Sequence, residues 1–403
     1  MLLYLCFLRF YFPEFSAFLK TIKITTYIKV KMKIIAITAN TSWYLFNFRK
    51  NTILTLLNEG YKVVVISPKD EYSEKLNALG VEYHHISIDQ GGTNPVKDMV
   101  TFWGFLRLYK KIKPDVVLNF TPKNNIYSTL AGSVFGTKAI NNIAGLGMVF
   151  INENITARLA RLLYKVSQPN AHTIFFQNEE DRELFRKYKL APMDITDRVP
   201  GSGVELSRFT ITPSCDDGIT RFLLIARMLY DKGIGHYVEA ARELKAKYGD
   251  SVEFRLLGFL DVNNPSAVSK YEMQAWVDEG IVDYLGVSDS VEKEIAQVDC
   301  MVLPSFYREG VPKSLLEACA MGKAIVTTDN VGCRETVEDG LNGFLCEPRS
   351  TSSLTEKLER MITLSHAERL AMGCQSRLKV EKEFDEKIVI SKYLHAVKSA
   401  IEQ

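Results

Sequence analysis

Two carboxylates and two cations in the second half of the chain follow predicted buried strands. Glu309 and Glu317 lie eight residues apart in the stretch 304–318, PSFYREGVPKSLLEA. The apolar run 301–303 before this stretch predicts a buried strand, and Pro312 suits the first turn of the helix that follows. Because the first N–H groups of a helix have no partner within it, such a helix start can bind an anion. The stretch therefore predicts an anion site with a carboxylate on either side.

Each part of this stretch has a predicted task. The backbone N–H groups of Gly310, Val311, Lys313 and Ser314 are expected to point outward from the helix start. Glu317 has apolar neighbours, which predict a buried position where a carboxylate needs polar partners. Ribose hydroxyl groups would supply them, whereas a solvent-facing helix position is the alternative interpretation. A ligand with both phosphate and hydroxyl groups, such as a nucleotide sugar, fits this site.

The two cations, Arg227 and Lys232, flank the loop that leaves an earlier predicted strand, residues 221–226. An Arg offers a planar fork to phosphate oxygens, and a Lys offers a compact charge on a flexible stem. Gly233 lets the backbone of this loop come close to a ligand. A basic pair in a loop is usually solvated surface. The position at the carboxyl end of a strand favours phosphate binding instead, because ligands of α/β sheets bind there.

The composition indicates a globular protein with more than one domain. The chain has 403 residues, of which 46% are hydrophobic and 24% charged. We expect no nucleic-acid partner, although the net charge of +2 by itself argues neither way. Seven cysteines without a Cys-x-x-Cys pair favour reduced thiols in a cytoplasmic protein.

Residues 1–31 form an apolar and aromatic leader that fits no standard targeting segment. Arg9, Pro13 and Glu14 interrupt it, so it contains no run of the roughly 18 apolar residues that a spanning helix needs. It also lacks a basic start and a small-residue cleavage site. Two interpretations stay open: translation that begins at Met32, and an anchor at the membrane interface.

Apolar runs without polar alternation recur along the chain and alternate with helical segments. The alternation restarts after the glycine-rich segment 199–203. This pattern predicts an α/β protein with two Rossmann-like doubly wound domains that face each other across a cleft. We expect an N-terminal acceptor-binding domain at 32–200 and a C-terminal nucleotide-sugar-binding domain at 201–384. A last helix at 385–403 is expected to pack back toward the first domain.

Four motifs together resemble family 4 of the retaining glycosyltransferases, which have the GT-B fold. They are the two cations, the two glutamates, Gly-Cys-Arg-Glu at 332–335 and DGLNGFL at 339–345. The resemblance extends from Met32 to the C-terminus. The segment 308–345 is similar to the branch that builds bacterial polysaccharides, such as O-antigen or capsule, on lipid diphosphate carriers.

The resemblance implies roles for the residues named above. The two cations would hold the diphosphate of the donor, Glu317 would bind its ribose, and Glu309 would face its sugar. The backbone at 310–314 would bind phosphate and sugar, and Val287 would lie against the base. The predicted catalytic residues are therefore Arg227, Lys232 and Glu309.

The first domain departs from the commonest pattern of the family. Many members have a glycine pair after the first strand, where this chain has Asn40-Thr41-Ser42-Trp43, and many have a donor-facing His where this chain has 142–147. Gly145 and Gly147 are expected to let the backbone contact the donor sugar instead. The residues predicted to bind the acceptor are Asn40, Lys123 and Asn142, of which the lysine would contact its diphosphate.

The chain contains neither Asp-x-Asp nor a His and Cys cluster with ligand spacing, so we expect no metal and no cofactor. The two cations and the helix start would then stabilise the leaving diphosphate. No carboxylate stands out as the nucleophile of a double displacement. The resemblance implies hexosyl transfer with retention, through front-face attack within one ion-pair-like complex, and UDP is the expected donor nucleotide.

Two predicted helices of the first domain combine apolar and basic residues. The helix at 96–113 carries more aromatic residues than one sheet-facing stripe needs, and its end is crowded with Lys and Arg. The helix at 153–167 carries Arg158, Arg161 and Lys165 at near-helical spacing. One interpretation is a buried aromatic face beside a solvated basic end. The other is a surface that contacts anionic lipid headgroups, which would make the enzyme peripheral on the inner face of the cell membrane.

We therefore expect a retaining glycosyltransferase that moves a sugar from a nucleotide sugar to a lipid-linked saccharide. Two alternatives stay open: a sugar-nucleotide epimerase or phosphorylase on the same fold, and a non-catalytic nucleotide-sugar-binding protein. An epimerase would turn over the donor without acceptor. A binding protein would bind UDP and release none.

Overall fold

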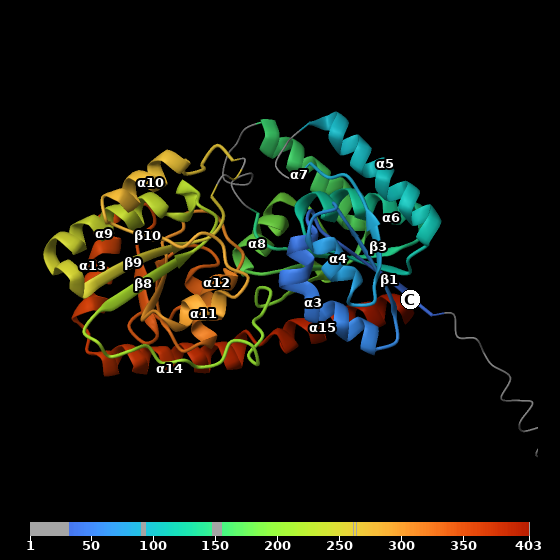
Figure 1. Cartoon of the computed structure of the whole chain (residues 1–403). Helices are drawn as coiled ribbons and strands as arrows, with labels where there is room; N and C mark the ends of the chain where they lie inside the picture. Colours follow the sequence, from blue (N-terminus) through green and yellow to red (C-terminus); the bar gives the residue numbers. More distant parts are fainter. Residues whose placement is uncertain (1–31, 90–93, 147–154, 261, 263, 403) are drawn as a thin grey trace, which may run out of the picture.

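Two parallel sheets form the centres of two α/β layers in the computed structural model, which describes residues 32–402 except 90–93, 147–154, 261 and 263. The first sheet has the order β3-β2-β1-β4-β5-β6-β7 and the second β10-β9-β8-β11-β12-β13. Figure 1 shows the two layers side by side, with helices on both faces of each sheet. This arrangement confirms the predicted fold class.

The first half of the chain forms the seven-stranded sheet and its helices. Its strands are β1 (Ile34–Thr38), β2 (Lys62–Ser67), β3 (Glu82–His85), β4 (Val116–Asn119), β5 (Lys138–Ile143), β6 (Ala171–Phe176) and β7 (Thr196–Arg198). Its helices are α3 (Ser42–Asn58), α4 (Tyr72–Asn77), α5 (Pro95–Ile112), the π-helix η1 (Asn124–Ser128), α6 (Thr129–Phe135), α7 (Ile155–Ser167) and α8 (Glu179–Tyr188), with short 3₁₀ turns η3 (Gln168–Asn170) and η4 (Met193–Ile195).

The second half forms the six-stranded sheet. Its strands are β8 (Thr220–Ile225), β9 (Val252–Leu257), β10 (Asp283–Tyr284), β11 (Cys300–Leu303), β12 (Ala324–Thr328) and β13 (Gly343–Cys346). Its helices are α9 (Ile234–Tyr248), α10 (Lys270–Asp278), α11 (Val291–Ala296), α12 (Lys313–Ala320), α13 (Thr351–Thr363), α14 (His366–Glu383) and α15 (Glu386–Glu402), with the 3₁₀ turns η5 (Tyr230–Lys232), η6 (Gly249–Ser251) and η7 (Arg334–Thr336).

Each sheet reverses its strand order at one place. The reversal lies between β1 and β4 in the first sheet and between β8 and β11 in the second. In open α/β sheets the crevice at such a point, outside the carboxyl ends of the strands, is where ligands bind. The topology therefore selects four loops as candidates for the site: those after β1, β4, β8 and β11.

Helix α15 crosses from the second half of the chain to the first. Its residues Val389, Tyr393 and Val397 are buried in the same apolar cluster as Ile35 of β1 and Phe175 of β6. Figure 1 shows α14 and α15 running in succession along the lower side of both layers. The C-terminal helix thus connects the two layers. The segment 199–219 also joins the sheets, and the boundary that we infer at 200/201 lies within it.

Three local expectations differ from the structure. The sequence predicts a helix from about Asn47 to Glu59. Helix α3 begins earlier, at Ser42, because the Thr41 hydroxyl accepts a hydrogen bond from the Tyr44 N–H at 3.0 Å and caps the helix. Strand β10 is two residues long, whereas the apolar run 281–286 predicted six. Strand β7 is short and polar and gave no apolar signal.

Candidate functional site

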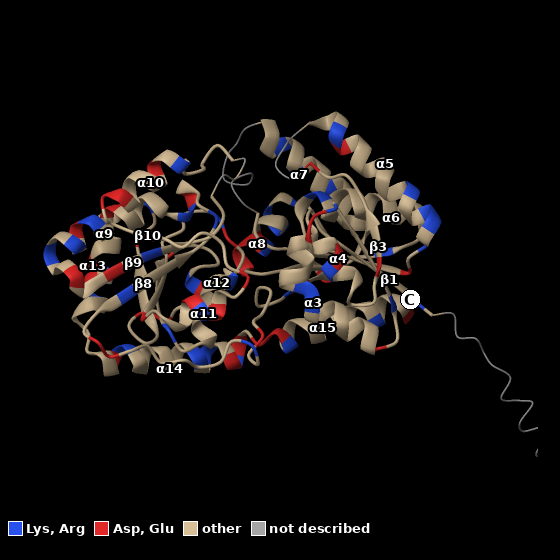
Figure 2. Cartoon of the chain, in the orientation of Figure 1, with Lys and Arg blue, Asp and Glu red and all other residues tan. Residues whose placement is uncertain are grey.

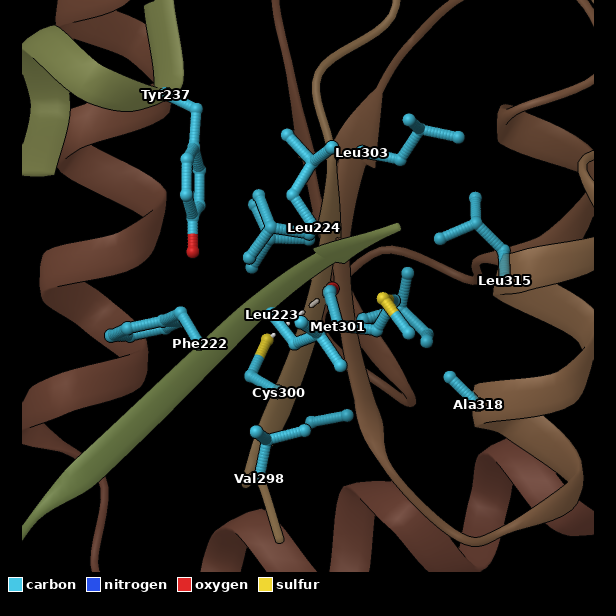
Figure 3. Packing of buried hydrophobic residues seen from close by; sticks show 14 of the residues in the cluster. Phe222, Leu223, Leu224, Tyr237, Val298, Cys300, Met301, Leu303, Leu315 and Ala318 are labelled. Carbon is cyan, nitrogen blue, oxygen red and sulfur yellow. Dashed lines mark hydrogen bonds between the residues drawn. The ribbon is translucent and has the colours of Figure 1, made fainter. Parts of the chain in front are cut away.

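Strand β11 leads directly into the stretch with the two glutamates. All four of its residues are buried. Figure 3 shows Leu315 and Ala318 of α12 on one side of the β8 and β11 strands, with Tyr237 of α9 and Phe222 of β8 on the other. Because the strand is packed on both faces, its carboxyl end and the loop 304–312 have a fixed position at the switch point of the second sheet.

The structure brings two predicted catalytic residues into direct contact. Lys232 Nζ forms an ion pair with Glu309 Oε1, and each side chain is only 13% exposed. The Ser305 hydroxyl lies within hydrogen-bond distance of the same oxygen, at 2.9 Å. Among the described residues none binds Glu309 Oε2. This oxygen can therefore accept a hydrogen bond from a ligand hydroxyl group.

Gly233 holds the lysine loop against the end of β11. Its φ is +80°, and a Cβ at this position would lie 2.2 Å from the carbonyl oxygen of Pro304. Any other residue would collide there, so the glycine fixes the approach of the two loops. The ion pair between Lys232 and Glu309 depends on this approach.

Arg227 is exposed at the carboxyl end of β8. Its guanidinium forms no hydrogen bond or ion pair with any residue in the described part of the chain, so it is free to bind a ligand. It acts electrostatically on Tyr307, whose pKa is raised by burial and by Glu309 and lowered in turn by Arg227. The loops after β8 and β11 thus present one free cation, one paired cation and one carboxylate at the same crevice.

Glu317 is buried, as predicted from its apolar neighbours, and its nearest cation comes from its own helix. The residue is 9% exposed, and its Oε1 lies 3.8 Å from Lys313 Nζ. Burial raises the pKa of Glu317 while Lys313 opposes the shift, and burial lowers the pKa of Lys313 while Glu317 opposes it. Lys313 Nζ also donates to the carbonyl oxygen of Asn47 at 2.6 Å and lies 4.6 Å from the ring centroid of Phe48. The pair therefore links α12 to α3 of the first domain.

The helix start differs from the prediction at two residues. Helix α12 begins at Lys313, and Pro312 is its N-cap with an extended ψ of 121° rather than its first helical residue. The prediction that the Val311 N–H is open to a ligand is wrong, because it donates to Gln177 Oε1 at 3.2 Å. The N–H groups of Gly310 and Ser314 have no hydrogen-bond partner among the residues that the structure describes.

The loops after β5 and β11 lie in backbone contact. Gly145 has a φ of +109°, and a Cβ there would lie 2.7 Å from the Gly310 nitrogen. A Cβ on Gly310 would in turn lie 2.1 Å from Gln177 Oε1. Gly145 thus brings the first domain to the loop that carries Glu309. Gly147 lies outside the described residues.

An ion pair beside this contact was not anticipated. Arg308 Nε lies 2.5 Å from Oδ1 of Asp181, which is fully buried in α8. Burial raises the pKa of Asp181, and Arg308 opposes the shift. The Asn178 amide also donates to the Glu309 carbonyl oxygen at 3.4 Å. The acidic start of α8 was visible in the sequence, but its partner 127 residues away was not.

The predicted acceptor residues separate into two groups. Asn40 and Lys123 line one cavity of about 740 Å³ at the switch point of the first sheet. The Asn142 side chain is 1% exposed, and its Oδ1 accepts a hydrogen bond from the Tyr393 hydroxyl of α15 at 2.8 Å. The prediction that Asn142 contacts the acceptor is therefore wrong, because alternate strand residues point to opposite faces and this one faces α15. Val287, predicted to lie against the base, is exposed in the loop after β10.

The described part of residues 32–402 offers neither a metal site nor a membrane-spanning helix. No group of three or more His, Cys, Asp or Glu side chains in that part of the chain could hold a metal ion. No helix described there is both long and apolar enough to span a bilayer.

Two parallel α/β domains, with cations and carboxylates where their loops meet, form the GT-B fold. A family model described as glycosyl transferase 4-like matches residues 33–178, and one described as glycosyl transferases group 1 matches residues 220–363. The chain belongs to the glycosyltransferases that these two models describe, one model for each domain.

Individual proteins resemble most of the chain. The N,N'-diacetylbacillosaminyl-diphospho-undecaprenol alpha-1,3-N-acetylgalactosaminyltransferase of Campylobacter jejuni is 29% identical over 368 residues, which cover 87% of this chain and 94% of that protein. The UDP-Gal:alpha-D-GlcNAc-diphosphoundecaprenol alpha-1,3-galactosyltransferase of Escherichia coli is 24% identical and covers 70% and 75%, respectively. The crystal structure of a glycosyltransferase from Rickettsia africae superposes with a TM-score of 0.72 at 18% identity, over 93% of this chain and all of that one.

Proposed function

We propose that this protein transfers a sugar from a UDP-sugar, with retention of configuration, to a saccharide that is linked to a lipid through a diphosphate. The observation that carries the proposal is the contact of the two domains at Gly145 and Gly310, beside the pair of Lys232 and Glu309. The names of the relatives from Campylobacter and Escherichia support the acceptor class, since both specify a saccharide on diphospho-undecaprenol. The second name also specifies UDP-Gal.

The donor would lie along the carboxyl ends of β8 and β11. Arg227 and Lys232 would bind its diphosphate, since both are at the crevice and the first has no other partner among the described residues. Glu317 would accept hydrogen bonds from the ribose, and Glu309 Oε2 from a hydroxyl of the sugar. The N–H groups of Gly310 and Ser314 are free to bind oxygen atoms of the phosphate or sugar.

Transfer breaks the bond between the anomeric carbon and the phosphate oxygen. The acceptor hydroxyl forms the new bond on the same face, and its proton passes to the leaving phosphate oxygen. The diphosphate gains negative charge as its bond lengthens. Arg227 and Lys232 would stabilise that charge in a crevice already shaped to hold them, an effect worth about 10²–10³-fold in kcat for one donor group.

The two helices at the outer side of the first domain support a membrane-proximal site. Val96, Val100 and Trp103 of α5 form an exposed apolar stripe, and Ile155 of α7 is 85% exposed. Figure 2 shows α5 and α7 at the upper side of this domain, with charged residues toward both ends of α5 and uncharged residues along its middle. Exposed apolar stripes beside lysine and arginine suit contact with anionic lipids, which favours a peripheral position at the cytoplasmic membrane.

Release of UDP with and without a lipid-diphosphate disaccharide tests the proposal. We expect UDP release that depends on the acceptor, and an α-configured product from an α-linked donor in the proton NMR spectrum. Inverted configuration would exclude retention. Conversion of the donor without acceptor would favour the epimerase, and binding of UDP-sugar without any turnover would favour the binding protein.

A further inference from the structure

The cavity that Asn40 and Lys123 line is more apolar than a site for a saccharide alone would be. It measures about 740 Å³ and lies between α5, η1 and α7. Most of its wall is apolar and includes Met99, Phe102, Ile126, Leu130, Leu159 and Leu163. A cavity of this size takes a ligand of some tens of atoms, and apolar walls favour apolar groups. Sugars alone would leave these walls poorly matched.

Three polar side chains of the cavity wall form a hydrogen-bonded network, and Asn40, Asp89, Thr121 and Thr156 also line the cavity. Lys123 Nζ lies 2.5 Å from Asp98 Oδ1, and the Tyr127 hydroxyl donates to Asp98 Oδ2 at 3.0 Å. The lysine and aspartate side chains are only 18% and 17% exposed. Burial and the neighbouring Asp98 raise the pKa of Tyr127, so this hydroxyl stays protonated and remains a donor. Asp98 is thus paired with Lys123, the cation that an anionic ligand would bind.

The two ends of the cavity lead to different surroundings. At one end Gly145 lines the cavity and also contacts Gly310 of the donor loop. At the other, Met99 of α5 and Leu159 of α7 line the cavity and are 55% and 45% exposed. A ligand could therefore reach from the catalytic loop, past a lysine, to the apolar outer faces of two helices.

We propose that this cavity binds the first carbons of the apolar chain of the acceptor, and that the acceptor diphosphate displaces Asp98 from Lys123. The inference rests on the proposed function and specifies the substrate class of its acceptor site: an apolar chain joined through a diphosphate to a saccharide. Asp98 keeps the buried lysine paired when no acceptor is bound. On displacement, the carboxylate retains its hydrogen bond from Tyr127.

A series of acceptors with one saccharide diphosphate and alkyl chains of increasing length tests the apolar part. In assays without vesicles, KM should fall by up to about fourfold for each methylene group that becomes buried, and then level off. Branched isoprenoid chains of equal carbon number show whether the cavity prefers them to straight alkyl chains. A KM that does not depend on chain length would overturn the proposal.

Two leucines of α7 provide a matched pair of variants. Leu159→Asn should raise KM for the long-chain acceptor at least tenfold and leave the short-chain acceptor unchanged. Leu162→Asn changes a leucine of the same helix that is exposed and does not line the cavity, so both acceptors should react as with the wild type. Equal effects of the two variants on the long-chain acceptor would contradict the cavity assignment.

Asp98→Asn and Lys123→Ala test the exchange of partners. The asparagine keeps the Tyr127 hydrogen bond and removes the competing charge, so it should lower KM for the diphosphate-linked acceptor severalfold. Lys123→Ala should raise that KM and have little effect on a neutral alkyl glycoside. If both variants raised KM alike, the network would be structural only. If no diphosphate-linked saccharide of any chain length were extended, the proposed function itself would fail.

Discussion

The charged residues of the proposed donor site neutralise one another in pairs. Lys232 is paired with Glu309, Lys313 with Glu317, and Arg308 with Asp181, all near the loop after β11. Unpaired charges in such buried positions would be costly, so each pair protects the folded state. Arg227 is the exception among the described residues of this loop cluster, and we expect it to make the first contact with the donor phosphates.

Replacing Lys232 tests the proposed stabilisation of the leaving group. Lys232→Met should lower kcat by about 10²–10³-fold, because the developing charge loses a fixed cation. Thermal stability should also fall, because Glu309 loses its cation and keeps only the Ser305 hydroxyl, so kcat is compared at a temperature well below the unfolding transition of the variant. Lys247→Met, an exposed lysine of α9, is the control and should leave kcat unchanged. A near-normal rate for Lys232→Met would exclude its catalytic role.

Glu317 is predicted to act on donor binding rather than on chemistry. Glu317→Gln keeps the size of the side chain but replaces one carboxylate oxygen with an amide donor. Hydrogen bonds to charged groups contribute about 1.5–3 kcal/mol, so KM for the donor should rise roughly tenfold or more while kcat falls less. Titration with UDP by calorimetry checks this directly. Unchanged UDP affinity would show that Glu317 only pairs with Lys313.

The strands that carry the proposed site have a buried lysine at their other end. The amino ends of β11 and β12 lie on the opposite edge of the sheet from the site, and Lys323 is buried there at 2% exposure. Its Nζ donates to the carbonyl oxygen of Ala296 at 3.1 Å. Burial lowers the pKa of Lys323 to about 8, although Asp299 opposes the shift. The positive charge of Lys323, at the amino end of β12, therefore opposes folding.

The sign of this shift gives a pH dependence. Between about pH 8 and 10.5 the folded protein binds fewer protons at Lys323 than the unfolded chain, so stability rises with pH in that window. Lys323→Met should be more stable than the wild type at pH 7, by up to about 3 kcal/mol, and this advantage should shrink toward pH 10. Urea unfolding at both pH values measures it, with Lys382→Met on the exposed face of α14 as control. A difference that does not change with pH would contradict the account.

Local sequence patterns were sufficient to predict most strands and helices, but not the side-chain contacts between residues far apart in the sequence. The apolar runs at β2 and β11 predicted buried parallel strands because every such strand is covered on both faces. Periodicity could not show that Asn142 faces α15, since both faces of β5 are buried and either orientation is consistent with its sequence. Nor could it reveal that Gln177 takes the Val311 N–H, a contact between residues 134 positions apart. Long-range pairs of this kind arise from the approach of the two domains.

At the scale of the whole molecule, buried contacts hold the two α/β domains together. Arg49 of α3 is 1% exposed and donates to the Ser202 hydroxyl at 3.2 Å, while its guanidinium carbon lies 4.3 Å from the ring centroid of Phe120. Tyr393 of α15 packs against the same ring. The segment between the domains and the last helix thus share one buried contact. Gly145 and Gly310 bring the two domains together at the loops after β5 and β11.

Substitution of Gly145 tests whether this approach matters for transfer. Gly145→Ala places a Cβ against the Gly310 nitrogen and should separate the two loops, so kcat should fall at least tenfold, since a shift of about 1 Å can cost roughly 10²-fold. Gly80→Ala is the control, because its φ is also positive, at +90°, yet nothing lies within 4 Å of the added Cβ. Both variants should lose similar stability in thermal unfolding. Equal kcat values would contradict a catalytic role for the domain contact.

The most direct test of the central claim is the mass of the acceptor after reaction. Purified protein is incubated with a panel of UDP-sugars and a saccharide linked to a lipid through a diphosphate, and the products are analysed by mass spectrometry. We predict that the acceptor gains the mass of one sugar with at least one donor, and that Lys232→Met abolishes the gain. An acceptor of unchanged mass with every donor, together with donor turnover in its absence, would contradict the account.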